Sequence, residues 1–392
     1  MLNFDLYTPT RILFGRGSET KVGSLLAGRA KKVLLHYGGG SIKRSGLYDR
    51  IKASLSEAGI DFTELGGVQP NPRLSLVREG IALCRREGVD WILAVGGGSV
   101  IDSAKSIAAG FYYNGDHWKL HLEGGTIDAA LPVSVVLTIP AAGSEMSDNS
   151  VITNEETKQK HGFAHPLLRA VFSIINPELF FSLPKEQLAY GTVDIMSHIM
   201  ERYFTPTANT DVTDGMCESL LKTILKNAPL ILEDMENYDA WSELAFCGAL
   251  AHNGLLGMGR AQDWASHKME HELSAHYDVA HGAGLAVLTP FWMRYVYKEN
   301  LPIFAQFAAN VMGVGGGIRD MDSLAREGIA RLDAFFTRMG LPKTLRDLGI
   351  GGDRLEEMAK KCTHRVSGPE QPVGGLKKMH WQDVLAVYSA AQ

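Results

Sequence analysis

The sequence has few of the features that mark disulfide-stabilised, thiolate-metal or membrane-spanning proteins. Its 392 residues include four cysteines, and these stand far apart at Cys84, Cys217, Cys247 and Cys362. That spacing excludes a zinc cluster built on close cysteine pairs and predicts reduced thiols, as in a cytoplasmic protein. No apolar run approaches the roughly 18 residues that cross a bilayer. The first residues have neither the basic region nor the apolar stretch of a secretory signal peptide, so we expect none.

An excess of positive charge is also missing. The chain has 39 Lys and Arg residues and 44 Asp and Glu residues, for a formal net charge of −5. This balance argues against nucleic acid or an anionic membrane surface as the main partner. Because 45% of the residues are hydrophobic, the chain can bury a sizeable core, and its length predicts two domains.

The two halves of the chain carry different patterns. In the first half, β-branched runs at 31–37, 60–65, 91–95 and 133–139 alternate with helical patterns at 45–58 and 73–87. After about residue 185, helical windows follow one another at 185–204, 211–233, 238–258 and 263–276. We therefore predict an α/β domain over residues 1–182, with a Rossmann-like parallel sheet, and an all-α domain over residues 183–392.

Glycine-rich loops follow the expected strands of the first half. Gly96-Gly97-Gly98-Ser99 follows the third strand and opens a helix, with Ser99 as the expected N-cap and Asp102 in the first turn. Gly38-Gly39-Gly40-Ser41 repeats the arrangement, and 141–146 forms a third loop of small residues. Such loops bring backbone N–H groups close to phosphate and together favour a dinucleotide over turns without a ligand. The G-x-G-x-x-G fingerprint is absent, so this is not the ordinary Rossmann signature.

The first glycine loop also bears on the choice of cofactor. An acidic side chain after this strand would bind a ribose 2′-hydroxyl and repel a 2′-phosphate. The strand instead runs into glycines, with Lys43 and Arg44 close behind. This pattern favours NADP over NAD.

Candidate metal ligands lie in the helical half. Asp194 and His198 are four residues apart and share a helix face, His267 and His271 repeat that spacing, and His281 follows a probable helix break. A carboxylate with several imidazoles suits Zn²⁺ or Fe²⁺ and leaves a position open. Such a cation would act as a Lewis acid toward a carbonyl oxygen, while a nicotinamide exchanges hydride with the same carbon. A rival interpretation reads 267–271 as the inverted zinc-peptidase motif H-x-x-E-H, with Glu270 as general base.

Other residues have a functional and a structural interpretation. The stretch 111–125 is rich in histidine and is expected to be a solvated loop over the sheet. From its place in a polar run, Lys160 is expected to be solvated, and Asp102 lies where an acidic residue stabilises the first turn of its helix. Four residues either line a substrate pocket or pack in the core: Phe163, Phe246, Met258 and Trp264.

Taken together, the chain resembles the iron-activated (group III) alcohol dehydrogenases, most closely their NADPH-dependent butanol dehydrogenase and aldehyde reductase branch. The similarity runs almost end to end through ordered motifs: Asn3-Phe4, 9–15 (PTRILFG), 69–72 (QPNP), 96–105 (GGGSVIDSAK), 176–178 (NPE), 263–267 (DWASH) and His281-Gly282. The resemblance implies an architecture shared with dehydroquinate synthase and a homodimer.

The resemblance also assigns roles to individual residues. It implies that the metal, Fe²⁺ or Zn²⁺, is held by Asp194, His198, His267 and His281, and that His271 lines the pocket as a candidate proton relay. It implies a cofactor cleft formed by Gly38, Gly39, Ser41, Asn71, Gly97, Gly98, Ser99, Asp102, Thr138, Ser144 and Lys160.

The expected function is metal-dependent, NADP(H)-linked interconversion of small primary alcohols and aldehydes such as butanol and butanal. Three alternatives stay open. They are a glycerol or polyol dehydrogenase of the same superfamily, a dehydroquinate-synthase-like lyase, and a non-catalytic protein with a structural metal.

Overall fold

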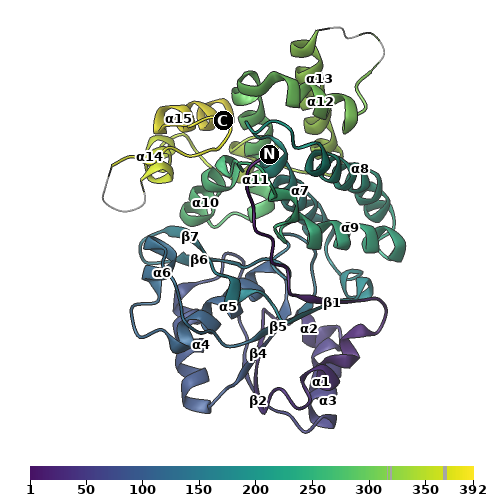
Figure 1. Ribbon diagram of the computed structural model, residues 1–392, viewed down its shortest axis with the longest axis vertical. Helices are drawn as coiled ribbons and strands as arrows, with labels where there is room; N and C mark the ends of the chain where they lie inside the picture. The colour runs from purple at the N-terminus through teal and green to yellow at the C-terminus, as the bar shows by residue number, and fades with distance from the viewer. Residues whose placement is uncertain (316, 318–319, 365–368) are drawn as a thin grey trace. The chain divides into compact units, whose positions relative to one another are not determined.

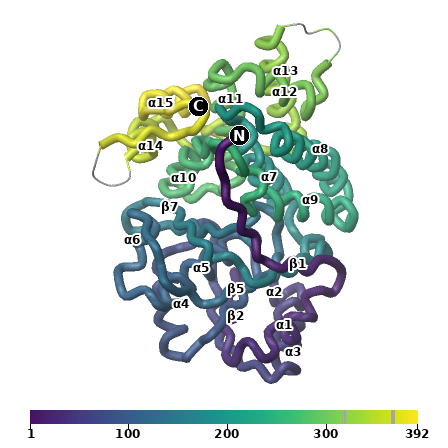
Figure 2. Tube along the Cα trace, viewed as in Figure 1, coloured from purple at the N-terminus to yellow at the C-terminus, as the bar shows by residue number. Residues whose placement is uncertain are grey.

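The computed structural model describes residues 1–315, 317, 320–364 and 369–392. The chain forms two units, one of Tyr7–Leu183 and one that combines Met1–Leu6 with Pro184–Gln392. Met1 donates to the carbonyl of Ala208 at 3.2 Å, and the Leu2 N–H donates to that of Gly259 at 2.7 Å. The first residues of the chain therefore belong to the unit built from its C-terminal part (Figure 2).

The first unit is built on a six-stranded parallel sheet (Figure 1). Its strands are β1 (Arg11–Phe14), β2 (Lys32–Tyr37), β3 (Asp61–Leu65), β4 (Trp91–Gly96), β5 (Val133–Leu137) and β8 (Phe172–Ile175). They are ordered β1-β8-β5-β4-β2-β3. The covering helices are α1 (Val22–Leu26), α2 (Ser41–Arg44), α3 (Leu47–Glu57), α4 (Leu74–Glu87), α5 (Gly98–Tyr112) and α6 (Trp118–Glu123). An antiparallel hairpin, β6 (Asn149–Asn154) and β7 (Gln159–Ala164), completes the unit.

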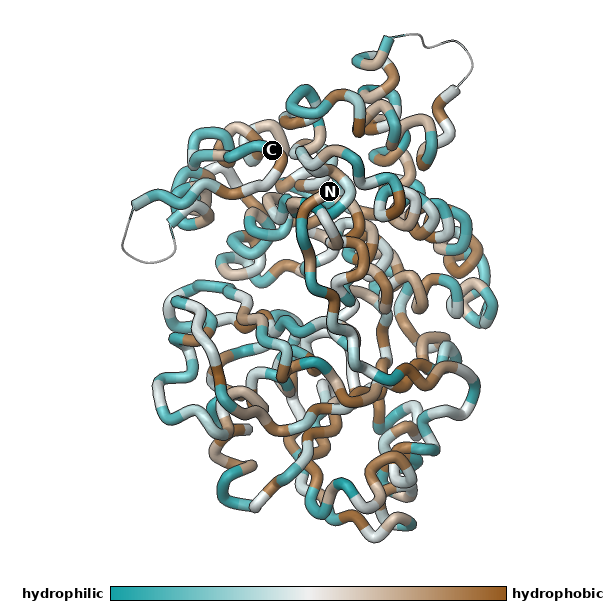
Figure 3. Tube along the Cα trace, viewed as in Figure 1, coloured by the Kyte–Doolittle hydropathy of each residue, from teal (hydrophilic) through white to brown (hydrophobic). Residues whose placement is uncertain are grey.

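Apolar strands place the core of this unit at the centre of the sheet. Every residue of β4 and β5 is buried, as expected for parallel strands covered on both faces. In Figure 3 these central strands are drawn mostly in brown, whereas the outer helices alternate between brown and teal. The predicted α/β class is confirmed, and the four expected strands correspond to β2, β3, β4 and β5.

Several elements of the first unit were not predicted. β1 and β8 are only four residues long, too short to give a periodic signal, and the hairpin strands β6 and β7 are polar. The helix expected over 45–58 is α3, which begins at Leu47 because Gly46 adopts a left-handed conformation (φ 71°) after the short helix α2.

The second unit is helical, as predicted. Its helices are α7 (Lys185–Tyr203), α8 (Asp211–Glu233), α9 (Tyr238–Ala251), α10 (Ala265–Tyr277), α11 (His281–Val296), α12 (Leu301–Asn310), α13 (Met321–Arg338), α14 (Leu355–Thr363) and α15 (Trp381–Ala390). The helix expected over 238–258 ends at Ala251, and Gly254 then turns the chain with φ 102°. None of the helices in the described ranges combines the length and apolar character that a membrane crossing requires.

The expectation of a solvated loop at 111–125 is wrong. His117 immediately precedes α6 and His121 lies within it, and they are 5% and 1% exposed. The Nδ1 of His121 lies 3.2 Å from the carbonyl of His161, so it carries the proton and Nε2 accepts from the Ser106 hydroxyl at 2.9 Å. Ser106 then accepts from Nε2–H of His117 at 2.6 Å. Both imidazoles are neutral in this arrangement. The sequence interpretation was wrong because it inferred solvent exposure from the polar residue types alone.

We predict that these buried rings make the first unit sensitive to acid. Burial lowers the pKa of His36 and His117 to about 4 and that of His121 to about 3. Unfolded histidine has a pKa of about 6.5, so between pH 6.5 and 4 the unfolded chain binds more protons than the folded one. The stabilisation is complete above pH 6.5 and falls as the pH drops, by about 1–2 kcal/mol per histidine at pH 5.

Urea unfolding at several pH values tests this prediction. His117→Gln and His36→Gln should each lose about 1–2 kcal/mol less than the parent protein between pH 7 and 5. Equal pH dependence in all three proteins would contradict it.

Candidate metal centre and phosphate-binding loops

Four side chains from three helices of the second unit converge on one carboxylate oxygen. Oδ1 of Asp194 lies 3.3 Å from Nε2 of His198, one turn further along α7. The same oxygen lies 3.8 Å from Nε2 of His267 in α10 and 3.9 Å from Nε2 of His281 at the start of α11. Two ligands of one tetrahedral ion with bonds near 2.1 Å would be about 3.4 Å apart. The structure thus places the three predicted imidazole ligands beside Asp194, and the ligand atoms of Asp194, His267 and His281 lie within 4.8 Å of one another.

The backbone around α10 explains how distant histidines reach α7. Asp278 adopts a left-handed conformation (φ 55°) that ends α10, so that His281 can begin a new helix. The next residue, Gly282, packs directly against α7, where a β-carbon would lie 2.2 Å from the carbonyl oxygen of Tyr190. This close approach of α11 to α7 requires glycine and sets His281 beside Asp194.

The donor atoms fit a cation. Asp194, His198 and His267 are 4–5% exposed, and neither Oδ1 of Asp194 nor the ring nitrogens of His267 have a hydrogen-bond partner among the described residues. Such buried polar atoms are costly unless a ligand satisfies them. Burial holds the pKa of His198 well below its usual value, so the ring stays neutral, as a ligand must be. Burial alone would lower the pKa of His267, but the carboxylates of Glu201 and Asp194 raise it to about 9, so the pocket favours positive charge.

Three further residues contact the second ring nitrogen, Nδ1, of the candidate ligands. None of them was predicted to belong to this metal centre. Glu201 lies 3.3 Å from Nδ1 of His267, and Glu270 hydrogen-bonds Nδ1 of His281. His252 approaches Nδ1 of His198 with its own Nδ1 at 2.9 Å. Glu201 follows His198 by three residues and Asp194 by seven, a spacing on the same helix face that could have identified it. No comparable spacing points to His252.

His271 and Trp264 lie at the edge of this centre. The ring of His271 is half-buried, 5.9 Å from the ring of His281. Trp264 packs its edge against His198 and His267, with ring centres 5.7 Å and 5.3 Å away. Of the other pocket candidates, Phe246 is 48% exposed, and Phe163 packs in the core of the first unit.

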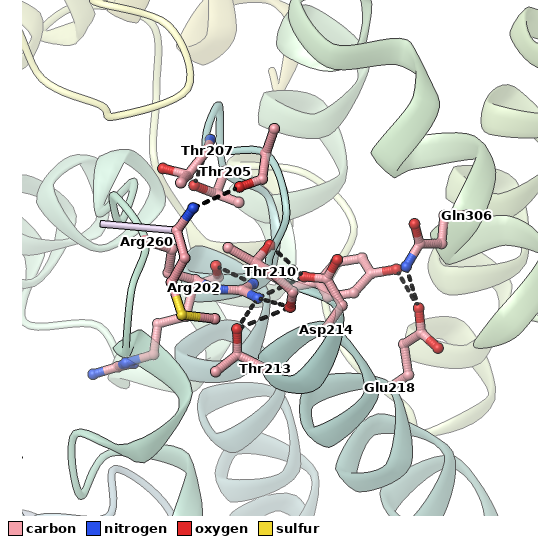
Figure 4. A network of polar contacts seen from close by, with 12 residues as sticks. Arg202, Thr205, Thr207, Thr210, Thr213, Asp214, Glu218, Arg260 and Gln306 are labelled. Carbon is pink, nitrogen blue, oxygen red and sulfur yellow. Dashed lines mark hydrogen bonds and ion pairs between the residues drawn. The ribbon is translucent and has the colours of Figure 1, made fainter. Parts of the chain in front are cut away.

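A buried arginine network fixes the end of α7 (Figure 4). Arg260 donates to the carbonyls of Arg202 and Thr210, each at 3.0 Å, and to Asp214 at 2.6 Å and Thr213. The side chain of Arg260 is completely buried. The network ties the helix that carries Asp194 to the start of α8.

In the first unit, the predicted loops lie side by side. β2, β4 and β5 are neighbours in a parallel sheet, so the loops after Tyr37, Gly96 and Leu137 leave the same edge. A β-carbon at Gly97 would lie 2.0 Å from Cγ2 of Ile139, and one at Gly39 would meet no described atom within 4 Å. Gly39 therefore leaves its backbone open to a ligand, as a phosphate cradle requires.

Two predicted capping roles are wrong. Gly97, not Ser99, is the N-cap of α5, and among the described residues no side chain caps this helix, which leaves its N-terminal amides available to an anion. Asp102 does not cap. It accepts from the hydroxyl of Ser144 at 2.5 Å and from the N–H of Val151 at 2.9 Å.

The loop after β5 is also fastened by a buried lysine that was not predicted. Lys105 is fully buried, and its ammonium donates to the carbonyls of Ser144, Ser147 and Asn149 at 2.6, 2.8 and 3.1 Å. Lys105 and Asp102, one turn apart on α5, therefore hold the loop that carries Ser144. Thr138 donates its N–H to Gly96 at 3.1 Å, which joins this loop to the one after β4.

Lys160 is not solvated. It is 6% exposed and donates to the side chain of Asn71 at 3.0 Å, so two predicted cofactor residues meet. Asn71 is itself 5% exposed and in the left-handed region (φ 55°). Gly38, Gly98 and Ser99 are half-buried and Ser41 is exposed, all at the edge where the three loops lie.

One family model matches the first unit of the chain, and a second matches the helical unit. The model of the iron-containing alcohol dehydrogenases matches residues 9–177, and that of the C-terminal part of the Fe-containing alcohol dehydrogenase family matches residues 188–392. The chain belongs to the iron-containing alcohol dehydrogenase family.

Individual relatives are similar along their whole length. The probable NADH-dependent butanol dehydrogenase 1 of Bacillus subtilis is 44% identical over all of both chains. The NADPH-dependent aldehyde reductase YqhD of Escherichia coli is 36% identical over 92% of this chain and 93% of its own. A crystal structure of NADH-dependent butanol dehydrogenase A from Thermotoga maritima superposes with a TM-score of 0.95 at 40% identity, over 100% of this chain and 99% of that one.

Family membership decides between the interpretations of the helical half. In the structure, Nε2 of His267 and Nε2 of His281 lie 3.8 Å and 3.9 Å from Oδ1 of Asp194, so both rings face the same carboxylate. The zinc-peptidase interpretation of 267–271 is wrong, and Glu270 is bonded to His281 and Ser274.

We predict that Asp214→Ala destabilises the helical unit by about 3 kcal/mol, because it leaves the buried Arg260 without its carboxylate. Asp211→Ala is the matched control, an exposed aspartate in the same first turn that should cost less than about 1 kcal/mol. Chemical denaturation of the two variants compares these values. Equal losses would show that the ion pair contributes no special stability.

Proposed function

We propose that the chain is a metal-dependent, NADP(H)-linked alcohol dehydrogenase and aldehyde reductase acting on small primary alcohols and aldehydes of the butanol and butanal type. The observation that carries the proposal is the convergence of three imidazole Nε2 atoms on Oδ1 of Asp194. The names of the similar proteins, butanol dehydrogenase and aldehyde reductase, support the substrate class.

The donor set suggests how the chain acts. Asp194, His198, His267 and His281 would hold Fe²⁺ or Zn²⁺, which supplies Lewis-acid polarisation of the substrate oxygen when bound. With one carboxylate and three imidazoles as ligands, the substrate oxygen would enter as a fifth ligand, an expansion of coordination that catalytic zinc sites show. His271, whose ring centre lies 5.9 Å from that of His281, would hold the proton that the alcohol oxygen gains or loses at its ring nitrogen.

The loops of the first unit would bind the cofactor. The N-terminus of α5 and the open backbone at Gly39 suit a pyrophosphate. Asn71 and Lys160 form a buried polar pair in the same unit. Because no acidic residue follows β2 and Lys43 and Arg44 do, we propose a preference for NADP(H). The NADH-dependent names of similar proteins define the competing outcome.

A homodimer in the cytoplasm completes the proposal. β1 lies at one end of the strand order, and Phe14 within it and Tyr7 shortly before it in the chain are 41% and 61% exposed. An open strand edge flanked by apolar side chains is suited to covering by a second copy of this chain. The four cysteines are free, as expected in a reducing compartment.

Replacing one candidate metal ligand should abolish metal binding and leave cofactor binding intact. His267→Ala is expected to lose bound metal and at least a thousandfold in turnover while NADPH still binds, because the phosphate loops lie in the other unit. Metal analysis, NADPH fluorescence titration and an aldehyde reduction assay measure the three properties. Undiminished turnover without the histidine would refute the metal assignment, and His276→Gln, elsewhere on α10, serves as the control.

The substrate and cofactor can be tested together. The metal-reconstituted protein should consume NADPH with straight-chain aldehydes, and its kcat/KM should exceed that with NADH by about tenfold or more. Replacing Lys43 and Arg44 by alanine should lower the value for NADPH and spare that for NADH. Preference for NADH with glycerol would favour the polyol dehydrogenase, and cofactor binding without turnover would favour a binding protein.

A further inference from the structure

The imidazoles of the proposed metal centre differ in how their second ring nitrogen is held. In His281, Nδ1 is hydrogen-bonded to the carboxylate of Glu270. In His267, Nδ1 lies 3.3 Å from Glu201, but the same carboxylate oxygen also accepts the backbone N–H of His267 at 3.0 Å. Glu201 therefore contacts both a ring and the backbone at the first turn of α10, whereas Glu270, itself on α10, contacts the ring of a ligand candidate on α11.

Three neighbours fix the carboxylate of Glu270. Its side chain is completely buried, one oxygen accepts from the hydroxyl of Ser274 one turn along α10, and the other faces Nδ1 of His281. Gly284, one turn after His281 on α11, provides the space, because a β-carbon there would lie 2.8 Å from Cγ of Glu270. Each carboxylate oxygen of Glu270 thus has a hydrogen-bond partner, and one of these partners, His281, is a candidate metal ligand.

The hydrogen bond also fixes the tautomer of His281. An ionised carboxylate only accepts, so Nδ1 must carry the proton and Nε2 must present its lone pair. That Nε2 lies 3.9 Å from Oδ1 of Asp194. A carboxylate on the far nitrogen of a ligand imidazole fixes the ring and makes it a stronger donor.

We propose that Glu270 is a positioning residue: through Nδ1 of His281 it sets the orientation, tautomer and donor strength of this ligand and so raises the affinity of the centre for its divalent ion. The inference rests on the proposed function, because it concerns the same centre. It gives the glutamate of 267–271 a role quite different from that of a general base.

Zn²⁺ affinity of the metal-free full-length protein, measured by competition with a chromophoric chelator, tests this role. Glu270→Gln is nearly isosteric, and we expect it to bind Zn²⁺ 10- to 100-fold more weakly, with a larger loss in Glu270→Ala. The visible spectrum of the Co²⁺-loaded protein should change in both variants. NADPH affinity should not change, because the phosphate loops lie in the other unit.

Glu272→Gln is the matched control. Glu272 is a buried glutamate on the same helix, 7% exposed, whose carboxylate lies 3.8 Å from His276 instead. It should bind Zn²⁺ and give the Co²⁺ spectrum like the parent protein. If Glu270→Gln does not fold, Ser274→Ala is measured in its place, since it keeps the carboxylate but removes its hydroxyl donor, and it should weaken Zn²⁺ binding several-fold.

The outcomes separate this inference from the proposed function. Parental Zn²⁺ affinity and an unchanged Co²⁺ spectrum in Glu270→Gln, or in Ser274→Ala if that variant is used, would overturn the positioning role while leaving the metal centre in place. Equal losses in Glu270→Gln and Glu272→Gln would also overturn it, because they would reflect a general disturbance of α10. A parent protein that binds neither ion would refute the metal centre itself.

Discussion

A single buried carboxylate oxygen, Oδ1 of Asp194, is the point on which the helical unit is organised. Three imidazoles from α7, α10 and α11 face it, and burying such a set of polar atoms without a common partner costs free energy. The packing of these helices therefore has to bring the donors together and leave space between them. A divalent ion would satisfy all four donors at once, so in the proposed function the metal centre and the packing of these helices depend on one another.

Strain at the ends of α10 is the local cost of this arrangement. Trp264 and Asp278, which flank the helix, both have positive φ angles, 69° and 55°. A bulky residue such as tryptophan rarely adopts this conformation, and strain of this kind is found at functional sites held by their surroundings. Asp263 provides part of that hold, because it accepts the N–H groups of Ala265, Gly375 and Leu376 at 2.8–2.9 Å. The helix that carries His267 is thus fixed by contacts remote in sequence.

What could be predicted from the sequence is what local spacing and composition control. The four-residue spacing of Asp194 and His198 placed both on one helix face, and the apolar runs identified the buried strands β4 and β5. The glycine-rich loops could be predicted because each directly follows one of the expected strands. The resemblance to a family supplied the grouping of His267 and His281 with Asp194, which spacing alone left open.

What could not be predicted depends on contacts between distant segments. The polar run around Lys160 suggested a solvated side chain, yet Lys160 meets Asn71 in a buried pair. The histidines of 111–125 can be buried because Ser106 provides their hydrogen-bond partner. Gly97 is the N-cap instead of Ser99, since the helix begins two residues earlier than the residue type suggested. Glu270 gained its role only through a histidine eleven residues away on another helix.

X-ray absorption spectroscopy of the protein reconstituted with Zn²⁺ or Fe²⁺ tests the central claim most directly, because it reports the atoms around the bound ion. The account predicts one ion per chain, with scattering from three imidazoles and one carboxylate oxygen at ligand distances near 2.0–2.2 Å. An ion with sulfur neighbours, or a shell without imidazole scattering, would contradict it.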